Sequence, residues 1–285
     1  MHLAAFAVKI ANHEIDVAIP VVVRRYGLCP LARPGDFLQL ALRCASLDEG
    51  LRLAEEAFNS GLKIEAVIYS DELAQKDRAH KSIEQLAEVA RRSASASEKL
   101  LESISYTKTP QGIVVLAQRP ASNVDQLTSV VDSTSLLVVL HQINNPVNVG
   151  AILRTAEAAA VAGVITTKNT SDPFSPKSLR GAMGSAFRLP VWADADYEQV
   201  IEWCDGKNIQ TVCTDASAKV SYTEFSWTTS AIALILGPES TGLTDNEIAA
   251  ARMAVSIPMS GEVESLNVSV AAGIVLFEAA RQRRQ

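Results

Sequence analysis

The stretch LLVVLHQINNPVNVGAILRTA, residues 136–156, decides the fold because it joins two kinds of structure through a polar corner. Its first eight residues are mostly apolar, as in a strand that is buried on both faces of a parallel sheet. Asparagine, proline and glycine then interrupt the apolar run. From Ala151 onward the apolar residues follow helical spacing. The stretch therefore predicts a strand–turn–helix unit of an α/β domain.

The same alternation continues to the end of the sequence. Further strands are expected over residues 162–167, 188–193, 209–215, 231–237 and 254–259, and helices over 151–161, 176–186, 197–206, 244–252 and 267–284. Near-continuous apolar strands that alternate with helices predict a mostly parallel sheet covered on both faces.

The first half has an α/β pattern of its own, with a helix over 47–59 and strands over 63–70 and 112–118. A polar, turn-rich stretch separates the two patterns and is interpreted as a linker. The expected organisation is an uncertain N-terminal segment (1–46), a smaller α/β domain (47–118), the linker (119–135) and a larger α/β domain (136–285).

Charge and cysteine usage exclude several classes of protein. The formal net charge is −6, whereas a basic nucleic-acid-binding domain usually has a pI above about 9, so contact with nucleic acid would need a local patch. The four cysteines form no CxxC pair, so we expect no metal and reduced thiols in a cytoplasmic protein. No apolar run reaches the roughly 18 residues of a membrane span, so no membrane partner is expected.

Familiar nucleotide and hydrolase motifs do not occur. The sequence has no GxGxxG after the first strand of the larger domain, no Walker A loop and no GxSxG elbow. His141 falls within a predicted strand and is interpreted as a structural residue. Three polar segments at strand ends remain, which is where α/β proteins bind ligands.

The first segment is the opening corner. Asn148 is expected to cap the helix that Gly150 opens, and Arg154 could reach back over that cap. An amide and a guanidinium beside a positive helix end suit a phosphate or a ribose. A capped helix with a surface arginine explains the stretch equally well.

The second and third segments are LILGPESTGLTDNEI (234–248) and SIPMSGEVESLNVSVAAGIVLFEA (256–279). Gly237 would let a ligand approach the backbone, and Glu239 could serve as an acid, an orienting group or an arginine partner. Met259 and Leu266 could sandwich a flat ring, with Ser265 and Asn267 adding hydrogen bonds. Without a ligand, the same residues would form a turn, a helix capped by Thr244 or Asp245, and a second capping motif with a core methionine.

Together and in this order, N-x-G-A-I-x-R-T-A, L-G-x-E-x-x-G-L and I-P-M-x-G-x-x-x-S-L-N-V-S-x-A resemble the three motifs of the SpoU/TrmH family of RNA ribose 2'-O-methyltransferases, within the SPOUT superfamily. The segment PKSLRGAMGSAFRLPV (176–191) also resembles that family. The resemblance covers roughly residues 47–285. It implies a catalytic domain with a deep trefoil knot, a homodimer with its site at the interface, and S-adenosylmethionine as cofactor.

The resemblance also implies roles for single residues. Gly237, Ile257, Met259 and Leu266 would line the cofactor pocket, and the catalytic set would be Asn148, Arg154, Glu239, Ser265 and Asn267. Arg154 would position the ribose-phosphate and stabilise the developing alkoxide, because a guanidinium has a pKa above about 12 and accepts no proton while charged. Asn148 and Glu239 would orient Arg154, while Ser265 and Asn267 would hold the cofactor end or the nucleotide.

Residues 47–118 are similar to the RNA-binding domain of the family's ribosomal-RNA members, which favours ribosomal RNA over transfer RNA as substrate. The closing ARQRR (280–284) would contact RNA phosphates, or would simply place cations at a helix C-terminus. Three alternatives stay open: a transfer-RNA 2'-O-methyltransferase, a non-catalytic RNA-binding or ribosome-assembly protein on the same fold, and an enzyme that methylates a base nitrogen.

Overall fold

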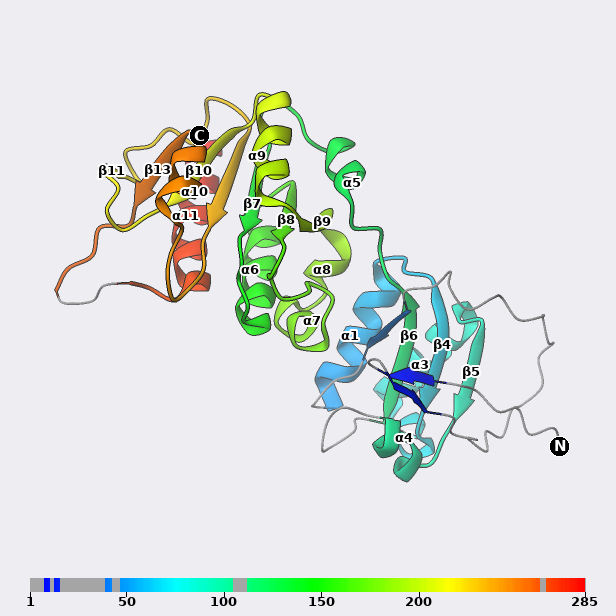
Figure 1. Cartoon of the computed structure of the whole chain (residues 1–285). Helices are drawn as coiled ribbons and strands as arrows, with labels where there is room; N and C mark the ends of the chain where they lie inside the picture. Colours follow the sequence, from blue (N-terminus) through cyan, green and yellow to red (C-terminus); the bar gives the residue numbers. More distant parts are fainter. Residues whose placement is uncertain are drawn as a thin grey trace. The chain divides into compact units, whose positions relative to one another are not determined.

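The computed structural model describes residues 8–10, 13–15, 39–42, 47–104, 112–261 and 265–284 (Figure 1). The chain divides into two compact units, Met1–Arg119 and Pro120–Gln285. Within the described residues, no helix is both long enough and apolar enough to cross a membrane.

The N-terminal unit is built on a four-stranded sheet. Its strand order is β3 (Gln39–Leu42), β6 (Ile113–Gln118), β4 (Ile64–Tyr69) and β5 (Arg92–Ser95), with β4 and β5 parallel and the other pairs antiparallel. The helices are α1 (Leu47–Asn59), α2 (Asp71–Ala74), α3 (Asp77–Val89) and α4 (Glu98–Ile104). A separate antiparallel pair joins β1 (Val8–Ile10) to β2 (His13–Ile15). The core of this unit forms where α1 and α3 bury leucine and alanine side chains such as Leu53, Ala57 and Leu86.

The C-terminal unit holds a seven-stranded sheet in which every neighbouring pair is parallel. The strand order is β11 (Val220–Ser221), β13 (Met253–Ser256), β10 (Gln210–Thr214), β12 (Ile232–Leu236), β7 (Leu136–Leu140), β8 (Gly163–Thr167) and β9 (Val191–Ala195). The predicted mostly parallel sheet is therefore confirmed. The trefoil knot stays a prediction.

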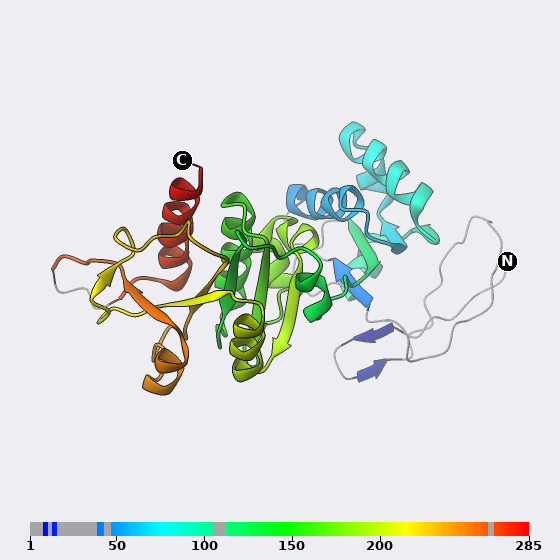
Figure 2. The ribbon, with the colours of Figure 1, turned by 90° about the horizontal axis from the view of Figure 1, so that it is seen from above.

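Helices cover both faces of this sheet. Figure 2 shows α6 (Pro146–Ala158) and α11 (Val268–Arg283) on one face, and α9 (Tyr197–Gly206) and α10 (Asp245–Ala250) on the other. Leu137 and Val139 of β7 belong to the core cluster that contains Val200 and Cys204 of α9. Val138, which lies between Leu137 and Val139 in β7, is also fully buried. Burial on both faces explains why the strands read as continuous apolar runs.

Two glycines let α6 and α7 (Pro176–Ala182) cross with their backbones in contact. A Cβ atom added at Gly150 would lie 2.3 Å from the Ser178 carbonyl oxygen, and one at Gly181 would lie 3.2 Å from Gly150 Cα. The separation at Gly150 is shorter than real Cβ contacts and the one at Gly181 is tighter than most of them, so a side chain at Gly150 would push the helices apart. This crossing fixes α6 beside the strand ends.

Several element bounds differ from the sequence-based expectation. The helix expected over 176–186 breaks because Met183 and Gly184 both have positive φ, and α8 (Ser185–Arg188) then takes the start of the strand expected at 188. Strand β7 ends at Leu140, before Gln142 with its φ of 54°. Strand β13 ends at Ser256 and not at Met259.

Part of the expected linker belongs to the C-terminal unit. Helix α5 (Val124–Thr128) lies within residues 119–135, and Leu127 at its centre is fully buried in the core cluster with Leu137 and Ile165. A Cβ atom at Gly163 would meet the Leu127 side chain at 2.3 Å. A polar composition predicted a linker because one buried leucine among polar residues leaves little periodic signal.

Candidate active site

One hydrogen-bond chain joins a residue from each of the three sequence motifs. Asn148, in the first turn of α6, is buried and donates from Nδ2 to Glu239 Oε1 at 2.6 Å. Asn267, at the start of α11, donates from Nδ2 to Asn148 Oδ1 at 3.3 Å. The two partners stand 91 and 119 positions away from Asn148 in the sequence. The fold thus brings the three predicted residues Asn148, Glu239 and Asn267 together.

Asn148 is free for this role because another residue caps its helix. The expectation that Asn148 is the N-cap is wrong: Asn145 is the cap and accepts a hydrogen bond from the Val147 N–H at 3.0 Å. Pro146 occupies the first helical position, where its missing N–H costs nothing. Asn148 therefore lies inside the first turn, and its carboxamide can bond to Glu239 and Asn267 of the other two motifs.

Asn267 caps α11. Its Oδ1 accepts hydrogen bonds from the Ser269 N–H at 2.9 Å and from Ser269 Oγ at 2.6 Å. Because the oxygen is engaged by the cap, the carboxamide nitrogen is left to donate to Asn148. The network thereby fixes which way the Asn267 amide is turned.

Glu239 lies in the loop between β12 and α10, and its side chain is exposed apart from the contact with Asn148. Gly237, at the start of this loop, was expected to admit a ligand close to the backbone. A Cβ atom there would lie 2.8 Å from Leu243 Cγ. The space beside Gly237 is thus needed by Leu243, which folds back over it and packs against the core cluster.

Arg154 is exposed on α6, and among the described residues it makes no hydrogen bond or ion pair. Within one chain Glu239 bonds to Asn148 and not to Arg154, so the orienting role expected of Asn148 and Glu239 stays a prediction. Helix geometry separates Arg154 from Asn148: residues six positions apart point about 120° away from each other. Ser265 is likewise exposed and has no bonding partner in the described part of the chain.

The four residues expected to line a cofactor pocket lie in the two sequence segments that also contain Glu239 and Asn267. Gly237 and Ile257 are half-buried, while the side chains of Met259 and Leu266 are exposed to 36% and 37%. Among the described residues, no group of three or more His, Cys, Asp or Glu side chains is arranged to hold a metal ion.

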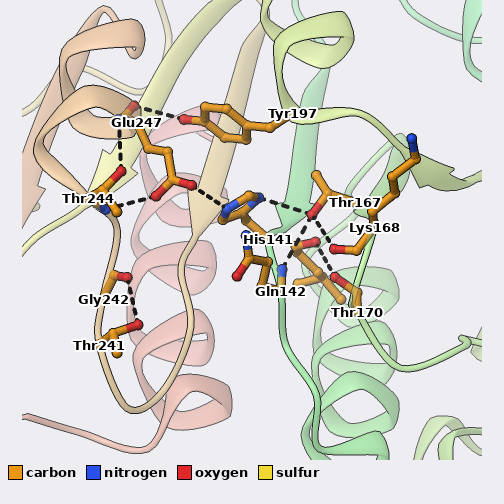
Figure 3. A network of polar contacts seen from close by, with 11 residues as sticks. His141, Gln142, Thr167, Lys168, Thr170, Tyr197, Thr241, Gly242, Thr244 and Glu247 are labelled. Atoms are coloured by element: carbon orange, nitrogen blue, oxygen red, sulfur yellow. Dashed lines mark hydrogen bonds and ion pairs between the residues drawn. The ribbon is translucent and has the colours of Figure 1, made fainter.

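A second polar network lies at the end of β7 (Figure 3), and sequence reasoning had not assembled it. His141 is buried, with Nε2 at 2.9 Å from Glu247 Oε1 and Nδ1 at 3.0 Å from Thr167 Oγ1. The Tyr197 hydroxyl donates to the Glu247 carbonyl oxygen at 2.8 Å. The spacing Thr244-x-x-Glu247 is that of a capping box and was the signal that could have located Glu247.

This network affects the ionisation of its members. Burial opposes the charge on Glu247, but hydrogen bonds from Thr244 and His141 outweigh it and lower the pKa of that carboxyl. Burial raises the pKa of Tyr197 well above its usual value. The interpretation of His141 as a structural residue agrees with its two hydrogen-bond partners.

The C-terminal arginines are partly engaged by the protein itself. Arg281 forms an ion pair with Glu278 at 2.8 Å, and Arg283 donates to the carbonyl oxygens of Thr134 and Ser230. These contacts favour the interpretation of ARQRR as a helix end.

Comparisons with known proteins identify the family. The model of the SpoU rRNA methylase family matches residues 135–277, about half of the chain. The chain belongs to the SpoU rRNA methylase family. Residues 45–115 also match the model of the MRM3-like substrate binding domain. The recognition drawn from the three motifs is therefore confirmed, and the protein is a methyltransferase of this family.

Curated SpoU relatives extend over most of the chain. The 23S rRNA (uridine(2479)-2'-O)-methyltransferase of Streptomyces viridochromogenes is 30% identical over 257 residues, which cover 88% of this chain and 84% of the relative. The 23S rRNA (guanosine-2'-O-)-methyltransferase RlmB of Ralstonia nicotianae is 33% identical over 213 residues, covering 73% and 84%.

Solved structures agree with the SpoU assignment. The SpoU methyltransferase AviRb from Streptomyces viridochromogenes, in complex with the cofactor AdoMet, superposes with a TM-score of 0.74 at 28% identity and covers 82% of this chain and 88% of its own. An AdoMet-bound rRNA methyltransferase from Sinorhizobium meliloti superposes with a TM-score of 0.71 at 29% identity, covering 85% and 87%. The cofactor expected from the motifs is the one that these two relatives bind.

Proposed function

We propose that this SpoU methyltransferase transfers a methyl group from S-adenosylmethionine to a ribose 2'-hydroxyl of ribosomal RNA. The observation that carries the proposal is the hydrogen-bond chain from Glu239 through Asn148 to Asn267, which unites the three family motifs. The two curated relatives are named for a uridine and for guanosine, so the proposal concerns the ribose and not the base.

The residues around this chain fit the cofactor. S-adenosylmethionine carries a flat apolar ring and polar groups, and it supplies an electrophilic methyl group. Met259 and Leu266 offer exposed apolar surface for the ring, while Gly237 and Ile257 contribute half-buried backbone beside it. Ser265, with no hydrogen-bond partner among the described residues, is available to bind a polar end of the cofactor or the nucleotide.

Arg154 supplies the positive charge for the reaction. Since no described carboxylate pairs with it, its guanidinium is free to bind the ribose-phosphate and to stabilise the alkoxide that forms as the 2'-hydroxyl loses its proton. Much of the rate would come from holding that hydroxyl in line with the methyl group.

A homodimer would complete the site. Three large apolar side chains are exposed on α6 and α11, the two helices that pack together on one face of the sheet: Val147 at 57%, Val270 at 50% and Phe277 at 49%. A second copy of the chain would cover them, as exposed apolar patches mark protein interfaces. Because Arg154 points away from Asn148 on its own helix, we infer that Arg154 serves the site of the partner subunit.

The N-terminal unit supports an RNA substrate, because its matched family model is a substrate-binding domain. Near the site, Lys177 and Arg180 on α7 lack carboxylate partners among the described residues, and α7 lies against α6, which carries Arg154. These three cations lie on two adjacent helices of an otherwise acidic unit, and we propose that they contact RNA phosphates. We also propose that the protein acts on this ribosomal substrate in the cytoplasm.

The test is methyl transfer from labelled S-adenosylmethionine to defined RNAs. We expect the purified protein to label unmodified ribosomal RNA, with the methyl group on the ribose after nuclease digestion and mass spectrometry. Arg154→Ala should remove the labelling. Labelling of transfer RNA alone would support the transfer-RNA alternative, a methylated base would exclude ribose chemistry, and RNA binding without turnover would support a non-catalytic role.

A further inference from the structure

The loop 237–244, which carries Gly237 and Glu239, is tied at both ends to His141. At its start, the His141 N–H donates to the Leu236 carbonyl oxygen at 2.9 Å. At its end, the His141 ring lies 2.9 Å from the carboxylate of Glu247, in the first turn of the helix that follows the loop. One buried residue at the end of β7 thus holds both ends of the loop in place.

Glu247 performs two tasks with its two carboxylate oxygens. Oε2 accepts a hydrogen bond from the Thr244 N–H at 2.8 Å and so closes the capping box of α10. Oε1 meets His141. The last residue of the loop is therefore connected to the end of β7 through a single carboxylate (Figure 3).

Two further contacts hold the His141 ring. Thr167 at the end of β8 contacts Nδ1, and the Tyr197 ring packs against the imidazole with centroids 4.6 Å apart. The Tyr197 hydroxyl holds the Glu247 carbonyl oxygen. With the imidazole 4% exposed and both nitrogens engaged, its position is set by the ends of β7 and β8 and by the start of α9.

The other end of the loop reaches the candidate active site. Glu239 accepts the 2.6 Å hydrogen bond from Asn148, and Leu243 packs over Gly237. A change in the position of Thr244 would therefore move the Glu239 carboxylate and the backbone at Gly237 together. Shifts of about 1 Å in such groups are enough to impair binding and catalysis.

We propose that His141 and Glu247 are a positioning pair, which holds the loop 237–244 in the shape that receives the methyl donor. Neither residue touches the reacting atoms. The pair acts through the loop backbone and through Glu239. This inference rests on the proposed function, since it assigns the loop to the S-adenosylmethionine site.

The experiment measures the dissociation constant of S-adenosylmethionine by calorimetry, together with KM and kcat, for His141→Ala, Glu247→Gln and the double variant. Removing one partner leaves a buried polar group without its hydrogen bond, so each single variant should weaken cofactor binding about tenfold. The double variant should weaken it no further, because both changes break the same contact. His141→Gln, whose amide can still donate to Glu247, should recover most of the affinity.

Thr170→Val is the matched control. Thr170 donates to the Leu140 carbonyl oxygen at 2.9 Å, so the variant removes a hydrogen bond at the same strand end without touching the loop. It should bind the cofactor within twofold of the unaltered protein. All measurements are made at a temperature where circular dichroism shows each variant folded.

The outcomes separate this inference from the proposed function. Cofactor binding by His141→Ala within twofold of the unaltered protein, with only a lower melting temperature, would overturn the positioning role. Equal weakening in Thr170→Val would overturn it too. If the unaltered protein itself does not bind S-adenosylmethionine, the proposed function is wrong, and not only the positioning role of His141 and Glu247.

Discussion

Asn148 donates a 2.6 Å hydrogen bond to Glu239, and its carbonyl oxygen accepts one from Asn267 at 3.3 Å. A carboxamide is the side chain that can do both, since it carries a donor and an acceptor on one planar group. Asn148 is also buried, so neither contact competes freely with water. The loop after β12 and the start of α11 are thus held in register by one residue of α6.

Replacing Asn148 should disrupt this register. Asn148→Ala should lower kcat/KM for methyl transfer by about 10- to 100-fold, as expected when buried polar partners are left unsatisfied. Asn148→Asp should be worse, because it places a second carboxylate next to Glu239. Steady-state kinetics with labelled cofactor measure both. If Asn148→Asp were as active as the unaltered protein, the hydrogen-bond chain would have no role in the reaction.

Arg154 should be essential to the reaction but dispensable for folding, because it is exposed and makes no hydrogen bond or ion pair with the described residues. We expect Arg154→Ala to keep the melting temperature within about 1 °C and to lower kcat by more than about 100-fold. Arg154→Lys keeps the charge but loses the planar fork, and it should recover only part of the rate. A large loss of stability in Arg154→Ala would show that its role is structural.

Mixing inactive variants tests whether Arg154 acts across the dimer. In a heterodimer of Arg154→Ala and Asn148→Ala, one shared site would carry both defects and the other would carry none. After subunit exchange at equal concentrations, half of the dimers are mixed, so activity should return to about a quarter of the unaltered level. Absence of any recovery, with exchange verified by native mass spectrometry, would place Arg154 in the site of its own chain.

Gly150 in α6 and Gly273 in α11 should respond in opposite ways to alanine. Gly150→Ala would bring Cβ to 2.3 Å from the Ser178 carbonyl oxygen and should destabilise the fold by about 2 kcal/mol or more. Gly273→Ala in α11 would meet only the Thr155 methyl group at 3.8 Å, an ordinary contact. It should stabilise the helix by about 0.5–1 kcal/mol. Chemical denaturation measures both, and equal effects would show that the crossing is not tightly packed.

Local patterns were sufficient for most of the sheet. The apolar runs at 136–140, 163–167 and 232–236 became central parallel strands, because burial on both faces leaves a continuous apolar signal. Helices 47–59 and 197–206 matched to the residue, since both have clear apolar periodicity and stop signals. Strand β5, with the sequence RSAS, was missed because its pairing with β4 is a tertiary contact without an apolar signal.

Sequence reasoning identified some residues of the candidate active site but not the contacts among them. The motifs named Asn148, Glu239 and Asn267, but the sequence could not show that Asn145 would take the cap and leave Asn148 free. Nor could it show that His141 and Glu247, 106 positions apart, would meet. Such contacts depend on how β7 and β12 pair, which local spacing does not encode.

The two described cysteines should be unreactive in the folded protein. Burial raises the pKa of the Cys204 thiol to about 12 and that of Cys213 to about 11, so almost no thiolate is present at pH 8. In a Cys29→Ser/Cys44→Ser background, a thiol-specific reagent should label neither cysteine until denaturant unfolds the chain. Rapid labelling of the native protein would mean that this face of the sheet opens readily.

Glu157 should make the fold sensitive to acid. Its carboxylate accepts hydrogen bonds from Arg188 Nε at 2.5 Å and from Ser185 Oγ at 2.6 Å, which ties α6 to α8. The Arg188 hydrogen bond lowers the pKa of Glu157 against the opposing effect of burial. A carboxyl with a lowered folded pKa stabilises the fold above its unfolded pKa, and this stability is lost as pH falls through the folded value.

Glu157→Gln should therefore cost about 1 kcal/mol of unfolding free energy at pH 7, a modest value because the pair is partly exposed. The difference from the unaltered protein should shrink below pH about 4.5 and vanish once Glu157 is protonated in the folded state. Urea denaturation between pH 7 and pH 3 measures it. Glu202→Gln, which alters an exposed carboxyl of α9 with no hydrogen-bond or ion-pair partner among the described residues, is the control and should show no such change. A cost for Glu157→Gln that stays constant down to pH 3 would show that packing, and not the charge, holds α8 against α6.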